Sequence, residues 1–102
     1  MNFFQKEIQL DPYPRGFHLI TESIVSQMPD IQKIKIGQLQ IFIQHTSASL
    51  TINENADPSV RVDFENHMNK IVPENVPYYT HTYEGSDDMP AHIKSSLMGT
   101  SI

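Results

Sequence analysis

Residues 34–52, IKIGQLQIFIQHTSASLTI, show the most regular alternation of apolar and polar side chains in the chain. Leu39, Ile41 and Ile43 fall on one side of an extended backbone, and the positions between and around them are mostly glutamine. A period of two is typical of a β-strand with one buried face. We therefore expect two strands here, joined through the Thr-Ser-Ala-Ser stretch, and a further strand over residues 3–10, FFQKEIQL.

The clearest helix signal lies between two prolines. Asp57 can accept hydrogen bonds from the free amides of a first helical turn. Pro58 suits the first helical position because its missing N–H would have no partner there, and Pro73 marks the end. Apolar residues at helical spacing predict one buried stripe, made of Val60, Phe64, Met68 and Ile71.

Two shorter helices are expected as well. One begins near Thr21, which suits an N-cap, and Pro29 stops it. The other runs from about Asp88 or Met89 to Met98, and the glycine that follows closes it. Because strands and helices do not alternate as regular βαβ units, we expect an α+β fold with helices against a largely antiparallel sheet, in a single domain over residues 1–102.

Charge and composition exclude several partners. Lys plus Arg number 7 against 12 Asp plus Glu, the formal net charge is -5, and the basic residues are spread along the chain. Such a chain repels a polyanion, so we expect no nucleic-acid partner. No apolar run approaches the ~20 residues of a membrane helix, and no signal peptide is recognisable, so we expect no membrane partner. The absence of cysteine favours a cytoplasmic location.

Titratable side chains concentrate in residues 80–97, THTYEGSDDMPAHIKSSL. His81 and His92 flank a cluster of acidic residues. If Asp88 begins a helix, His92 lies one turn along the same face, and the pair could bind a common ion or share a proton. The alternative is structural, because Asp87 or Asp88 would also cap the helix and complement its dipole.

His45 ends the most apolar predicted strand and is followed by small hydroxyl residues. It either opens into a cavity or is a histidine at the edge of the core, bonded to a backbone carbonyl. Three histidines, with or without a carboxylate, would hold a divalent transition metal such as zinc and leave one position open for water. The metal ligands expected on this basis are His45, His81 and His92. Their spacing matches no recognised zinc signature.

Three stretches resemble the YjbQ family, also called the secondary thiamine-phosphate synthase family. They are RGFHLIT, HTSASLTINENADPSVRVDFE and YTHTYEGSDDMPAHIKSSLMGTS, and together they extend the resemblance over almost the whole chain. The resemblance implies a sandwich-like α+β fold with a mostly antiparallel sheet and two to three helices packed on it. It also implies a homotrimer, with a pocket near the subunit boundaries.

The same resemblance implies roles for particular residues. Its catalytic residues on this sequence are His45, His81, Asp88 and His92. Around them lie candidate substrate-binding residues, Glu54, Asn55 and Asp87. The implied activity is a weak thiamine-phosphate synthase, which joins a pyrimidine diphosphate to a thiazole phosphate, so the expected partner is a small phosphorylated substrate. The histidines, rather than the resemblance, are the reason to expect a divalent metal (zinc or magnesium) as the cofactor.

The sequence departs from the family pattern after MGTSI. Family members continue with strands that carry a Gly-Thr-Trp-Gln block and a Glu-His-Arg block, and neither is present here. We expect a domain without these C-terminal strands, either a fragment or a truncated member, with an exposed sheet edge. The alternative function is a non-catalytic or hydrolytic trimer that binds a metal or a phosphate.

Overall fold

The computed structural model describes residues 3–102. The chain divides into two compact units, Met1–Leu39 and Gln40–Ile102. Each unit is described by itself, and the expectation of a single domain over the whole chain stays a prediction. Every residue of the candidate site belongs to the second unit.

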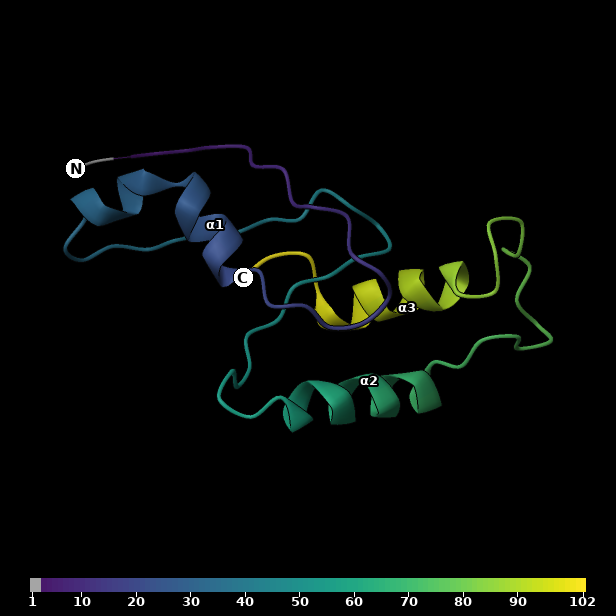
Figure 1. Ribbon diagram of the computed structural model, residues 1–102. Coiled ribbons are helices and arrows are strands. Elements are labelled where there is room, and N and C mark those ends of the chain that lie inside the picture. Colours follow the sequence, from purple (N-terminus) through teal and green to yellow (C-terminus); the bar gives the residue numbers. More distant parts are fainter. Residues whose placement is uncertain (1–2) are drawn as a thin grey trace. The chain divides into compact units, whose positions relative to one another are not determined.

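The first unit contains the α-helix α1, Thr21–Gln27, and the short 3-10 helix η1, Pro29–Lys33 (Figure 1). α1 ends before Pro29, as the sequence predicts, and Pro29 is the first residue of η1. The expected N-cap is wrong, because Ile20 takes that position and no side chain caps the helix. At the other end of α1, the side-chain amide of Gln27 donates to the backbone carbonyls of Ser23 at 3.1 Å and Gln9 at 3.2 Å. It therefore ties the extended N-terminal segment to the last turn of α1.

The second unit contains the α-helices α2, Ser59–Ile71, and α3, Asp88–Met98. Asp57 acts as predicted at the start of α2, since its carboxylate accepts from the Ser59 amide at 2.9 Å. The predicted stripe is wrong at its end, because Ile71 is exposed and Val72 is buried in its place. None of the helices in residues 3–102 has the length and apolar character needed to cross a bilayer.

A loop runs along α3 and is bonded to it at successive turns. The Ser95 hydroxyl donates to the Ala48 carbonyl at 2.8 Å, and Ser95 is only 4% exposed. One turn later the Leu50 amide donates to the Gly99 carbonyl at 3.1 Å. Gly99 has φ 96°, a conformation that favours glycine, so it can end the helix and turn the chain. The loop over residues 46–50 is therefore held against one face of α3.

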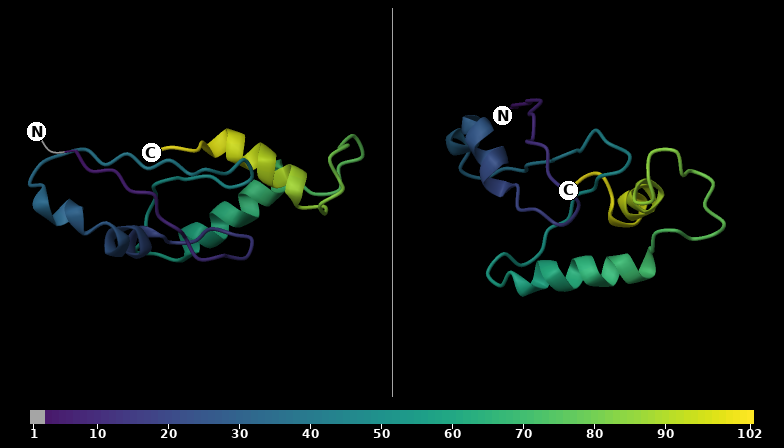
Figure 2. Two further views of the ribbon diagram at one scale, coloured as in Figure 1. Left: turned by 90° about the horizontal axis from the view of Figure 1, so that it is seen from above. Right: turned by 45° about the vertical axis from the view of Figure 1, so that its right-hand side comes forward.

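The expected antiparallel β-sheet sandwich is wrong. The described residues form one isolated antiparallel bridge, Phe42 with Ser101, and no sheet. Around it the Ile41 amide donates to Ile102 and the Ile43 amide to Thr100, both at 2.8 Å. Figure 2 shows the yellow C-terminal tail and the teal segment as thin tubes without arrows.

The reason for this error lies in what the alternation of residues 34–52 can specify. It makes a segment suitable for a strand, but a strand also needs a partner to take its amides and carbonyls. Residues 41–43 have such a partner in residues 100–102, and over the described residues the pairing extends no further. Ile36, in the same alternating segment, is 95% exposed.

The Ser95 contact leads to a first prediction. Ser95→Ala removes a buried hydroxyl that donates to the Ala48 carbonyl, and the free energy of unfolding should fall by about 1 to 2 kcal/mol. Denaturant unfolding followed by circular dichroism measures it. Ser96→Ala is the matched control, because Ser96 is exposed on the same helix and gains the same alanine helix propensity. Equal stability of the two variants would contradict the role of Ser95.

The cap of α2 leads to a second prediction. Hydrogen bonds from the Ser59 side chain and amide, with a smaller contribution from the Arg61 charge, hold the pKa of Asp57 below its ordinary value of 3.8. The charged cap therefore stabilises the fold at pH above 3.8, and this contribution is lost as the pH falls through the lowered pKa.

Asp57→Asn keeps an acceptor for the amide and removes the titration. Near neutral pH we expect the wild type to have a larger free energy of unfolding than Asp57→Asn. This difference between the two proteins should vanish at a pH well below 3.8. Unfolding curves across that pH range test this. Asp63→Asn, an exposed carboxylate on the same helix, serves as the comparison. A difference between wild type and Asp57→Asn that does not change with pH would refute the assignment.

Candidate metal centre

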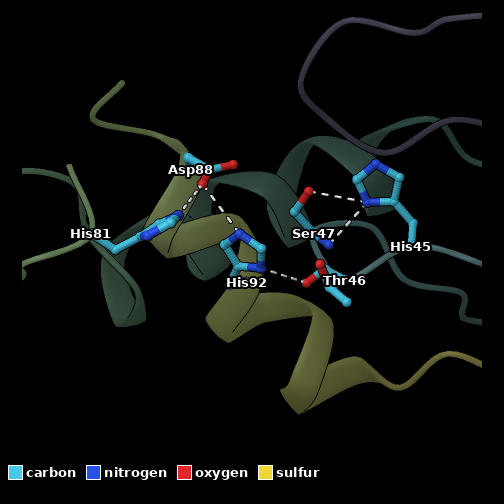
Figure 3. A network of polar contacts seen from close by, with 6 residues as sticks. All are labelled: His45, Thr46, Ser47, His81, Asp88 and His92. Atoms are coloured by element: carbon cyan, nitrogen blue, oxygen red, sulfur yellow. Dashed lines mark hydrogen bonds and ion pairs between the residues drawn. The ribbon is translucent and has the colours of Figure 1, made fainter. Parts of the chain in front are cut away.

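Two elements bring three polar side chains to one point. Asp88 begins α3, His92 lies one turn further along the helix, and His81 comes from the segment that precedes α3 (Figure 3). One carboxylate oxygen, Asp88 Oδ2, lies 2.8 Å from Nε2 of His81 and 3.2 Å from Nε2 of His92. The two imidazole rings meet edge to face, with centroids 5.3 Å apart. We call His81, Asp88 and His92 the three-donor cluster.

The second ring nitrogen of His92 sets its protonation pattern. Nδ1 lies 2.9 Å from the backbone carbonyl oxygen of Thr46. A carbonyl can only accept, so Nδ1 carries a proton. If the imidazole is neutral, Nε2 then carries no proton. Its lone pair faces the Asp88 carboxylate oxygen.

Two electron-rich atoms facing each other repel unless a positive charge lies between them. Either His92 takes a second proton, or a cation is shared by the cluster. The donor set fits a transition-metal cation, because two imidazoles and a carboxylate are common zinc ligands. A metal-bound histidine also donates its other N–H to a carbonyl, as His92 does to Thr46.

The spacing of the donor atoms agrees with this fit. One ligand atom from each residue of the cluster lies within 4.8 Å of the others. Tetrahedral ligands about 2.0 to 2.1 Å from an ion are about 3.3 Å apart, so small side-chain rotations would open the cluster around an ion. Solvent can reach it, since the side chain of His81 is 48% exposed, that of His92 32% and that of Asp88 17%.

His45 lies outside the three-donor cluster. Its Nδ1 accepts from the amide of Ser47 at 3.0 Å and lies 3.1 Å from the Ser47 hydroxyl. Figure 3 shows His45 and His92 on opposite sides of the Thr46–Ser47 backbone. Among the described residues the cluster thus unites three of the four residues expected to be catalytic. A metal-binding role for His45 stays a prediction.

The residues expected to bind substrate are not members of the three-donor cluster. Glu54 and Asn55 are exposed on the loop before α2, where the Glu54 amide bonds to the Asn53 side chain at 2.7 Å. Asp87 takes the N-cap position of α3, but its carboxylate makes no capping hydrogen bond. The predicted carboxylate cap is therefore wrong for Asp87. Substrate binding by these three residues stays a prediction.

The sequence interpretation missed Thr46 and Ser47 as determinants of the site. Thr46 contributes its backbone carbonyl, which every residue possesses, so no residue type could signal it. Ser47 contributes mainly its amide to His45, although its hydroxyl belongs to the small-residue stretch after that histidine. Only the path of the loop along α3 shows either role.

Known proteins are similar in sequence to this chain over most of its length. The UPF0047 protein YjbQ of Escherichia coli O157:H7 is 52% identical over 100 residues, which are 98% of this chain and 72% of that protein. UPF0047 protein sll1880 of Synechocystis is 52% identical over 68 residues, 67% of this chain and 46% of the relative. The chain thus spans between about half and three quarters of the length of these relatives.

A solved structure is also similar to this chain. The conserved hypothetical protein TT1486 of Thermus thermophilus matches with a TM-score of 0.72 and 31% identity, over 85% of this chain and 64% of that one. The chain spans less than two thirds of that protein. The family model described as UPF0047 protein YjbQ-like matches residues 6–102. The chain therefore belongs to the YjbQ-like UPF0047 family.

Proposed function

We propose that the three-donor cluster binds a divalent transition-metal ion and that this ion holds a phosphate group of a small substrate. The observation that carries the proposal is the geometry of His92. Its Nδ1 donates to Thr46, and its Nε2 lone pair faces the Asp88 carboxylate at 3.2 Å. A bound cation turns this repulsion into two favourable contacts.

The donor types favour zinc over magnesium. Imidazole nitrogen suits zinc-like ions, whereas magnesium prefers an all-oxygen shell with several waters. Three protein ligands leave a zinc ion one position for a substrate oxygen or water, where the ion offsets negative charge on a phosphate. The exposure of His81 supports access of a substrate to that position.

For the reaction, we propose the condensation suggested by the resemblance to secondary thiamine-phosphate synthases. The thiazole nitrogen attacks the methylene carbon of the pyrimidine diphosphate, the bond from carbon to oxygen breaks, and pyrophosphate leaves with the electron pair. Asp88 orients both imidazoles through its shared oxygen. Together the two imidazoles and Asp88 would hold the ion, which would offset the negative charge on the leaving pyrophosphate.

Hydrolysis is the second candidate, and the open position of the cluster favours it. The half-exposed His81 side chain leaves the centre accessible to water, which a zinc-like ion activates as a nucleophile. A homotrimer remains part of the proposal. It would cover apolar side chains that this chain exposes, such as Ile52 and Val62, and native mass spectrometry measures it directly.

Metal binding supplies the third prediction. Isothermal titration of zinc into the metal-free protein should show one ion per chain. His92→Ala removes one of three ligands and should weaken binding at least about 100-fold. His67→Ala, an exposed histidine on α2, is the matched control and should bind zinc as the wild type does. Zinc affinity that is the same in both variants would rule out the cluster as the metal site.

Turnover supplies the fourth prediction. With zinc bound, the protein should release pyrophosphate and form thiamine phosphate from the two phosphorylated precursors. His81→Asn removes one of the three metal ligands and should lower the rate by about 10- to 100-fold or more, while His67→Ala leaves it unchanged. Chromatography of the products separates the candidates. Free pyrimidine alcohol without thiamine phosphate indicates a hydrolase, and no product from either precursor would remove catalysis from the proposal.

A further inference from the structure

A pocket of about 680 Å³ opens where the C-terminal tail meets the segment before the loop. Its described lining is Phe42, Ile43, Gln44, His45, Thr46 and Thr100. No carboxylate is among these residues, although the chain carries 12 acidic residues and a net charge of -5. The polar side chains of the lining carry an imidazole, an amide and two hydroxyls, and each of these groups can donate a hydrogen bond.

The His45 ring has a defined protonation pattern. The Ser47 backbone N–H can only donate, and it lies 3.0 Å from Nδ1 of His45. Nδ1 must therefore be the acceptor nitrogen, and in a neutral ring the proton is on Nε2. Within residues 3–102 the structure assigns no other hydrogen bond to this ring, so Nε2–H is left for a ligand.

The pocket adjoins the metal centre through one residue. Thr46 lines the pocket, and its carbonyl accepts from Nδ1 of His92. Figure 3 shows His45, Thr46 and Ser47 next to the cluster on one continuous stretch of chain. As neutral rings, His45 and His92 have opposite patterns: His92 presents a lone pair at Nε2, whereas His45 presents an N–H donor there.

From this contrast we infer that the pocket is an oxyanion subsite, in which the Nε2–H of His45 donates to a phosphate group. Neutral donors and the absence of carboxylates suit an anion that a chain of net charge -5 would otherwise repel. Phe42 and Ile43 add apolar surface for the carbon skeleton of a phosphate ester. The inference rests on the proposed function only in assigning this phosphate to the substrate of the metal centre.

A first experiment tests the pattern on the His45 ring. Two-dimensional long-range ¹H–¹⁵N NMR of the metal-free protein distinguishes a protonated from an unprotonated ring nitrogen. We expect His45 to be protonated at Nε2 and unprotonated at Nδ1. The reverse pattern would overturn the inference, because the ring would then present a lone pair to the pocket.

A second experiment measures binding of inorganic phosphate to the metal-free protein. The amide resonance of Thr100 should shift in a saturable way with phosphate and not with chloride at equal ionic strength. His45→Leu should weaken the affinity by about tenfold or more, the effect of losing one hydrogen bond to a charged group. His45→Gln, which places an amide N–H near the position of Nε2, should stay within about threefold of the wild type.

The outcomes separate this inference from the proposed function. His45→Leu should keep the zinc affinity of the wild type, because His45 is outside the three-donor cluster. Phosphate binding that depends on His45 without any zinc binding would support the subsite and refute only the metal centre. No saturable shift in the wild type, or equal affinities in His45→Leu and wild type, would overturn the subsite.

Discussion

The hydrogen bond from Nδ1 of His92 to the Thr46 carbonyl connects the parts of the candidate site. It joins residues 46 positions apart and holds the start of the 46–50 loop to α3. It also requires a proton on Nδ1 of His92, so that in a neutral ring the lone pair of Nε2 faces Asp88. The candidate metal centre and the neighbouring pocket both adjoin this contact, because Thr46 belongs to the loop and to the pocket lining.

One face of α3 supplies the rigid element behind this contact. Asp88, His92 and Ser95 are spaced by four and three residues, so a period of 3.6 places them in one row. Asp88 and His92, at the N-terminal end of the row, belong to the candidate centre. Ser95 anchors the loop with a buried hydroxyl. Chemical groups placed on a helix in this way keep their spacing better than groups on a loop. His81, which comes from a loop, is also the most exposed member of the cluster.

The two histidines beside Thr46 show how the same residue type acquires different chemistry. His92 faces a carbonyl acceptor, and His45 faces an amide donor. In the neutral state, the first ring therefore offers a lone pair at Nε2, and the second offers an N–H donor there. This division of roles extends what membership of the YjbQ-like UPF0047 family establishes.

The sequence by itself determined the features that depend on near neighbours. Asp57, Pro58, Pro29 and Gly99 act within a few residues, so the three α-helices begin and end close to where local signals place them. The pairing of Asp88 with His92 follows from helical spacing alone. Only the tertiary structure decided the partner of residues 41–43, the arrival of His81 and the donors that face the two histidines. Alternation can make a segment suitable for a strand, but hydrogen bonds between distant residues depend on where the folded chain places each carbonyl and amide.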